Sequence, residues 1–105
     1  MVRLTVDLVP SAGSTCQILL ALRFLMVETR LQEGCLECSA WSAMDGSVRY
    51  IEEWVDEPTM LGRVRSDAFT SLLAVMEAAA KPPQVQFEFI SMMRGLDYIA
   101  DARGV

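Results

Sequence analysis

Two neighbouring carboxylates are the first candidates for chemistry in this sequence. Glu52 and Glu53 lie in the segment 50–54, which reads YIEEW. Successive residues of a strand point to opposite faces, so Glu52 shares its face with Tyr50 and Trp54. A carboxylate between two aromatic side chains can have a raised pKa and act as a proton acceptor near neutral pH. Glu52 is therefore one candidate for a general base.

A second interpretation of Glu52 is structural. Arg63 and Arg65 follow the strand at a distance that a short helix would span. Either guanidinium could form an ion pair with the Glu52 carboxylate across the junction between strand and helix. The pattern alone leaves both interpretations open.

Cys35 and Cys38 form a CxxC motif, which is typical of zinc and dithiol sites. In a regular strand, residues three apart point to opposite faces and lie roughly 10 Å apart, beyond disulfide reach. The chain has no second such motif and no histidine to complete four zinc ligands. We therefore expect no metal site and no dithiol function, and two small strand residues instead.

The composition excludes several classes of chemistry. The sequence contains no histidine, no asparagine and a single lysine, Lys81. A Ser-His-Asp triad and a histidine-ligated haem are therefore excluded, and a lysine Schiff base is left without support. The formal net charge is -5, so nucleic acid is not an expected partner.

The size and hydropathy indicate one globular domain. The chain has 105 residues, of which 52% are hydrophobic, and a domain this small buries only about two-thirds of its unfolded surface. That apolar content favours a surface covered by another subunit. No apolar run approaches the roughly 20 residues of a membrane span. The N-terminus lacks a signal pattern and the three cysteines suit a reducing compartment, so we expect a cytoplasmic protein without a membrane partner.

Hydrophobic periodicity predicts the order β-α-β-β-α-β. This order is typical of an α+β, ferredoxin-like fold, with an antiparallel sheet and both helices on one face. Residues 1–94 would form this domain and residues 95–105 a helical C-terminal tail. Turn and capping signals give the expected elements: strands 3–9, 35–42, 48–55 and 85–92, a first helix from Ser14 or Thr15 to about Gln32, a short helix from Pro58 broken by Gly62, and a longer helix from Ser66 to Pro82.

The first helix has two apolar stripes, whereas a helix that lies on a sheet needs only one. The first stripe comprises Ile18, Leu19, Leu22, Leu25 and Met26, and the second comprises Leu20, Phe24, Val27 and Leu31. The C-terminal tail, a partner subunit or a ligand cavity could cover the second stripe. The predicted second face of the sheet also carries apolar residues, which indicates a homodimer: Ile51, Val55, Ile90 and Met92.

The segment after the third strand carries a recognisable pattern. The YIEEW strand is followed by Met60, Val64, Ser66 and Phe69, and Gly34-Cys35-Leu36 precedes it. Over essentially the whole chain this pattern resembles the antibiotic biosynthesis monooxygenase domain family, of the dimeric α/β-barrel group. The resemblance implies a homodimeric, cofactor-independent monooxygenase that acts on a small electron-rich aromatic or quinol.

One departure from that family changes the expected site. The family's frequent histidine would fall at Arg63, which stays protonated and cannot act as a base. The missing asparagine and histidine argue against haem degradation. The resemblance then leaves Glu52 and Arg63 as catalytic candidates, with Arg63 at the mouth of a cavity and no metal or cofactor. The expected substrate-binding residues are Tyr50, Trp54, Phe24, Phe69 and Trp41.

An alternative is a non-catalytic dimer that binds a small apolar ligand or serves as an accessory protein. The fold cannot decide between the two functions. A closed cavity lined by Tyr50, Trp54 and the first helix would favour the oxygenase. A solid core would favour the non-catalytic protein.

Overall fold

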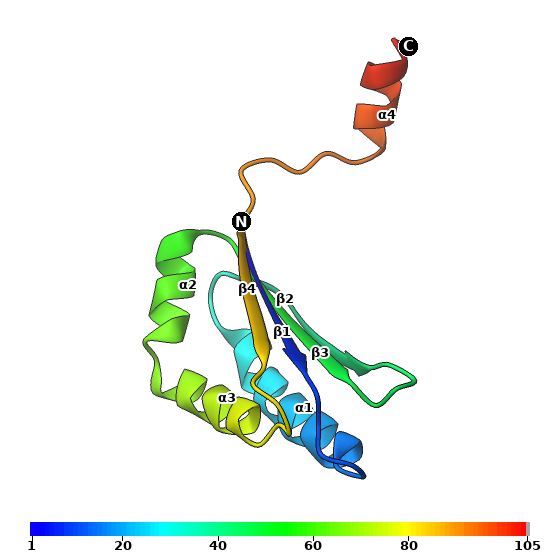
Figure 1. Ribbon diagram of the computed structural model, residues 1–105. Coiled ribbons are helices and arrows are strands. Elements are labelled where there is room, and N and C mark those ends of the chain that lie inside the picture. Colours follow the sequence, from blue (N-terminus) through cyan, green and yellow to red (C-terminus); the bar gives the residue numbers. More distant parts are fainter. Residues whose placement is uncertain (105) are drawn as a thin grey trace.

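The computed structural model describes residues 1–104 and contains four strands and four helices (Figure 1). Residue 105 of the expected tail lies outside the described residues. In chain order the elements are β1 (Val2–Leu8), α1 (Thr15–Leu31), β2 (Cys35–Ser42), β3 (Val48–Trp54), α2 (Glu57–Val64), α3 (Asp67–Glu77), β4 (Gln84–Phe89) and α4 (Leu96–Arg103).

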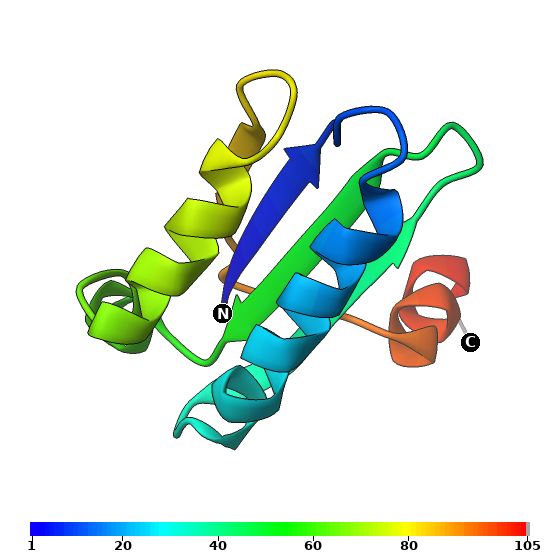
Figure 2. The same cartoon turned by 90° about the horizontal axis from the view of Figure 1, so that it is seen from below.

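The strands form one antiparallel sheet in the order β2-β3-β1-β4. Helices α1 and α3 lie side by side across one face of this sheet (Figure 2). The predicted α+β, ferredoxin-like architecture is therefore confirmed. Alternation in β1 buries every second residue, Val2, Leu4, Val6 and Leu8, beneath the helices.

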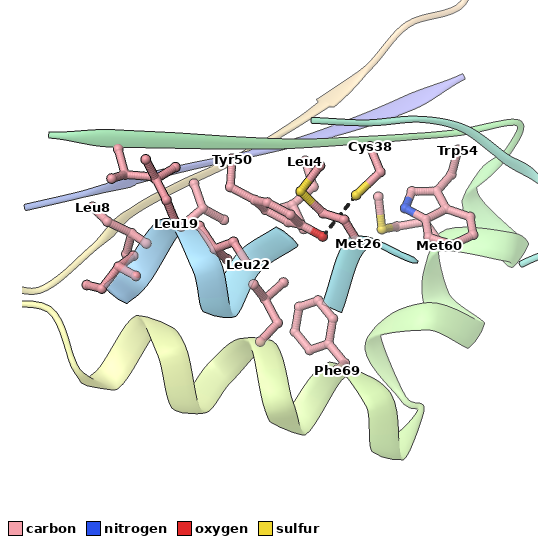
Figure 3. Packing of buried hydrophobic residues seen from close by; sticks show 14 of the residues in the cluster. Leu4, Leu8, Leu19, Leu22, Met26, Cys38, Tyr50, Trp54, Met60 and Phe69 are labelled. Atoms are coloured by element: carbon pink, nitrogen blue, oxygen red, sulfur yellow. Dashed lines mark hydrogen bonds between the residues drawn. The ribbon is translucent and has the colours of Figure 1, made fainter. Parts of the chain in front are cut away.

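The core lies between the sheet and α1, α2 and α3 (Figure 3). Helix α1 contributes its first apolar stripe, with Leu22 completely buried. Helix α3 contributes Phe69 and Leu72. β3 differs from β1, because between the buried Tyr50 and Trp54 it also buries the charged Glu52.

Three sequence-based boundaries are wrong. Gly62 does not break the short helix, because α2 runs through it to Val64. Helix α3 ends at Glu77, well before Pro82, so the two prolines shape the loop rather than stop the helix. Strand β4 ends at Phe89, where its pairing with β1 ends. Ile90 and Met92 therefore belong to the arm that leads to α4.

The open face of the sheet is more polar than the sequence predicted. Arg3 forms ion pairs with Glu53 and Glu88, and Arg49 forms an ion pair with Asp7. Ile51 does lie on this face, opposite Thr5 of β1. The prediction of an apolar second face is therefore only partly right. Ile51 lies there, but alternation places charged residues on the same face.

The predicted geometry of the CxxC motif is also wrong. Cys35 pairs with Trp54 and Cys38 pairs with Glu52, with a β-bulge between Cys35 and Glu37. The extra residue lets both cysteines face the helices, because cross-strand partners share a face. Two residues of strand rise separate their partners, about 7 Å. Both cysteines are free thiols.

The arm and α4 stand away from the rest of the protein (Figure 1). The Cα radius of gyration is 15.9 Å, against about 13 Å for a compact chain of this length. Helix α4 buries none of its residues. Across residues 1–104, no helix is long and apolar enough to cross a membrane.

Candidate active site

Four hydrogen bonds converge on the buried carboxylate of Glu52. Trp54 Nε1 donates to Oε1 over 2.9 Å, and the Tyr50 hydroxyl donates to Oε2. Arg63 donates through Nε to Oε1 (3.1 Å) and through Nη2 to Oε2 (2.9 Å). The side chains of Glu52 and Arg63 are 0% and 1% exposed. The carboxylate is therefore a fully bonded acceptor in the interior, which is what a buried charge requires.

Cys38 extends this network on the neighbouring strand. Its Sγ lies 3.4 Å from the Tyr50 hydroxyl (Figure 3). Because that hydroxyl already donates to Glu52, the thiol is the donor in this contact. Burial raises the pKa of Cys38 to about 11. Burial and then the charge of Glu52 raise the pKa of Tyr50 far above its usual range.

Arg63 is the cation of the site, and one of its nitrogens is unused. Its guanidinium lies over the ring of Phe69, 5.3 Å from the ring centre. Burial alone would lower the pKa of Arg63, but the hydrogen bonds and charge of Glu52 outweigh it, so the pKa is raised. Nη1 is buried and has no hydrogen-bond partner among the described residues.

Helix α2 holds Arg63 over the sheet. The Asp56 side chain caps the helix by accepting from Thr59 N at 2.9 Å, and Pro58 occupies the first turn. Gly34 lets α2 approach the start of β2. It has a φ of +87°, and a side chain there would collide with the Thr59 methyl group.

The structure brings together five of the seven residues that the sequence selected. Glu52, Arg63, Tyr50, Trp54 and Phe69 form one buried cluster, which we name the Glu52 cluster. The structure therefore confirms that Glu52 forms an ion pair with Arg63.

Two selected aromatics lie elsewhere. Phe24 is on the solvent side of α1 and is 79% exposed, and Trp41 is half-exposed on the open face of the sheet. Sequence reasoning missed Cys38 and Met60, which pack in the buried core (Figure 3). Cys38 could have been found by extending the register of the β2–β3 hairpin, which pairs Ala40 with Tyr50 and Cys38 with Glu52.

Arg63 does not lie at the mouth of a cavity. None of the five main hollows on the surface of residues 1–104 is lined by Glu52 or Arg63. Nor, within this part of the chain, do three metal-ligating side chains gather. Tyr50 and Trp54 are packed into the core rather than arranged around an open space.

This geometry limits what each group can do chemically. All acceptor positions of Glu52 are engaged, so it can hold and orient Arg63, but it can accept a proton only if a donor leaves. Arg63 keeps a free N–H group, which can bind an anion or a carbonyl oxygen. Tyr50 and Cys38 remain protonated and act as donors within the network.

Comparisons with known proteins support the fold. No family model matches the chain, and neither does any curated protein sequence. A solved structure from Deinococcus radiodurans, named a putative antibiotic biosynthesis monooxygenase, superposes with a TM-score of 0.80 at 16% identity and covers 90% of this chain and 97% of its own.

Two further solved structures have the same fold. A protein from Mycobacterium tuberculosis gives a TM-score of 0.77 at 16% identity and covers 90% of this chain and 98% of its own. Another putative antibiotic biosynthesis monooxygenase, from Nitrosomonas europaea, gives 0.76 at 10% identity, with coverages of 88% and 100%. The chain therefore has the ferredoxin-like fold found in proteins that carry this name.

Proposed function

We propose that the protein is a cofactor-independent monooxygenase that binds a small electron-rich aromatic, of the hydroquinone type, beside Arg63. The carrying observation is the unpartnered Nη1 in an otherwise satisfied cluster. A buried donor without an acceptor costs about 1–3 kcal/mol, so an oxygen atom delivered to Nη1 would be bound favourably. The fold shared with proteins named antibiotic biosynthesis monooxygenases supports the same general kind of activity.

In this proposal Arg63 stabilises the substrate as a phenolate. A guanidinium beside a phenol favours the charged form, and the released proton passes to water. Glu52 orients Arg63, and Tyr50 and Trp54 orient Glu52. The phenolate is electron-rich enough to reduce oxygen, so the protein supplies position and exclusion of water.

The reaction balances without an added reductant. A hydroquinone and O2 give a hydroxyquinone and water. One ring C–H bond breaks and one C–O bond forms with an oxygen atom of O2. The other oxygen atom leaves as water, and the substrate supplies all four electrons.

Substrate entry requires side chains to move, because the Glu52 cluster is closed in this structure. Met26, Met60 and Phe69 are buried in the core beneath the sheet (Figure 3). Methionine is flexible and tolerates repacking. We propose that displacement of Met60 and Phe69 opens the path to Arg63 Nη1.

The second candidate function is a non-catalytic small-ligand-binding or accessory protein. The solid packing around Tyr50 and Trp54 favours it, since both side chains are completely buried. In that case the Glu52–Arg63 pair only anchors α2 to the sheet.

Oxygen consumption with a panel of hydroquinones distinguishes the two functions. We expect the parent protein to consume oxygen faster than the buffer does, with one O2 consumed per quinol. Arg63→Lys keeps the charge but removes the planar guanidinium and with it Nη1. The rate of oxygen consumption should therefore fall about 100-fold, as it does when a positioned hydrogen-bond donor is lost. The matched control is Glu53→Gln, the adjacent carboxylate on the open face, which should retain the parent rate.

Glu52→Gln is a weaker test, because it leaves Arg63 as an uncompensated buried charge and costs about 3–5 kcal/mol of stability. Its activity has meaning only beside a melting curve. A parent rate equal to the buffer blank would sink the oxygenase, and a thermal shift with the same quinols would then support the ligand-binding protein. An Arg63→Lys rate equal to the parent rate would remove Arg63 from the site.

A further inference from the structure

The outer side of α1 carries a narrow apolar seam that nothing in the structure covers. We name this feature the α1 seam; it comprises Leu20, Phe24, Val27 and Leu31. These residues are spaced four, three and four positions apart, and their side chains are 64%, 79%, 61% and 82% exposed. This is the spacing with which one helix packs along another. The opposite side of α1 already lies on the sheet, so the α1 seam has the pattern of a second, helical contact.

Helix α4 has the complementary property. Leu96, Tyr98 and Ile99 are all more than half exposed. At 100° per residue, Leu96, Ile99 and Ala100 share one side of α4 with Arg103 of the last turn, and Asp97 and Asp101 lie together on the next side. Residues 1–104 thus contain two helix faces with exposed apolar side chains, one on α1 and one on α4.

Charges of opposite sign lie along one edge of each of these two faces. Arg23 and Arg30 flank the α1 seam on one side only, and Arg30 Nε donates to the Cys38 carbonyl, so this side looks toward β2. On α4, Arg94 is the ion-pair partner of both Asp97 and Asp101. One guanidinium for two carboxylates leaves an acidic side that can approach Arg23.

We propose that the α1 seam binds α4 of a second copy of this chain, so that two copies exchange their C-terminal arms. The arm leads away from its own body, and α4 stands well beyond the sheet (Figure 1). Seen from the helix side, the arm passes behind the sheet while α1 lies in front of it (Figure 2). The arm therefore points toward a neighbour rather than toward its own α1.

This inference rests on the homodimer predicted from the sequence and not on the oxygenase activity. It adds that each subunit contributes one arm and one seam, which gives two identical contacts related by the two-fold axis. In such a contact Leu96 and Ile99 pack against Phe24 and Val27, and Asp97 and Asp101 face Arg23.

Two full-length double variants test the contact by analytical ultracentrifugation. The seam variant is Phe24→Asp with Val27→Asp, and the arm variant is Leu96→Asp with Ile99→Asp. We expect each to raise the dimer dissociation constant at least tenfold. The matched control, Met44→Asp, changes a fully exposed apolar residue at the hairpin tip and should leave the constant unchanged.

Mixing the two variants distinguishes exchange from docking within one chain. A mixed dimer keeps one intact contact, because the normal arm of the seam variant meets the normal seam of the arm variant. Exchange therefore predicts that the mixture dimerises more tightly than either variant alone. A mixture no tighter than its components would overturn the exchange.

The remaining outcomes are also decisive. If both variants dimerise like the parent, the arm contact is absent, while a dimer formed through the open face of the sheet survives. If the parent is a monomer at all concentrations, both the homodimer and the arm exchange fail. Quinol-dependent oxygen consumption is measured separately and bears only on the proposed function.

Discussion

At Glu52 a full negative charge lies in the interior of a 105-residue protein. Transfer of such a charge from water is costly, and only the four donors around it make the burial tolerable. Well-packed apolar residues would often be as stable as an ion pair of this kind. The main effect of the Arg63–Glu52 pair is therefore to fix the position of α2 over β3, rather than to add net stability.

The buried hydroxyl of Tyr50 and the buried thiol of Cys38 predict a loss of stability at alkaline pH. The pKa values of Cys38 and Tyr50 are raised in the folded protein, so above about pH 9 the unfolded chain releases these protons before the folded one does. The free energy of unfolding should then fall by up to about 1.4 kcal/mol per pH unit for each group. Below pH 8 the two groups should contribute no slope.

Urea unfolding between pH 7 and 10.5 measures this effect. Tyr50→Phe and Cys38→Ala should each flatten the alkaline slope, although both variants lose a hydrogen bond. Tyr98→Phe is the control, because Tyr98 is half-exposed on α4. A parent protein whose stability is level up to pH 10.5 would contradict the buried network.

At the scale of elements, α2 is positioned by its contact with the start of β2. Gly34 combines a left-handed backbone with a close approach of Thr59, and Val55 Cγ1 would lie 3.2 Å from an added Cβ. This approach lets α2 lie near enough for Arg63 to reach Glu52. Gly34 therefore helps to position the guanidinium of Arg63 without contacting it.

Gly34→Ala should destabilise the protein by about 2–4 kcal/mol, from backbone strain and from the collision with Thr59. Gly13→Ala is a matched control, because Gly13 has a φ of +81° with open space around it, so it should lose only about 1–2 kcal/mol. Thr59→Ser removes the colliding methyl group and should partly rescue Gly34→Ala. Equal losses at Gly13 and Gly34 in urea unfolding would refute the close approach.

The sequence predicts the elements of this fold better than it predicts the details of the site. Alternation at Val2, Leu4 and Val6 and the Asp45-Gly46 turn suffice for the strands and their antiparallel order. The bulge after Cys35 carries no sequence signal, since Leu36 is neither glycine nor proline, and without it Cys35 cannot be placed on the same face as Cys38. The free nitrogen of Arg63 depends on packing from three elements, so no local pattern reveals it.

At the scale of the whole molecule, the arm makes the chain longer than a compact domain. The extents are 52 × 32 × 22 Å, and the exposed apolar side chains of α4 and the α1 seam lie on separate parts of that shape. Exposed apolar surface of this kind is typical of interaction sites.

We expect a homodimer of about 23 kDa, twice the chain mass of 11.7 kDa, in light scattering at micromolar concentration. We expect the open face with its central Ile51 to form the main contact, and its ion pairs should make association depend on salt. Ile51→Lys is the variant that should raise the monomer fraction. A parent mass near 12 kDa throughout would dismiss the dimer.

The bulge at Leu36 also bears on how the protein avoids forming aggregates. β2 lies at the edge of the sheet, and a regular edge strand offers its free backbone groups as a template for any other extended chain. The extra residue interrupts that template and increases the local twist. Strand addition is thereby disfavoured at the start of β2, where a regular edge would otherwise invite another extended chain.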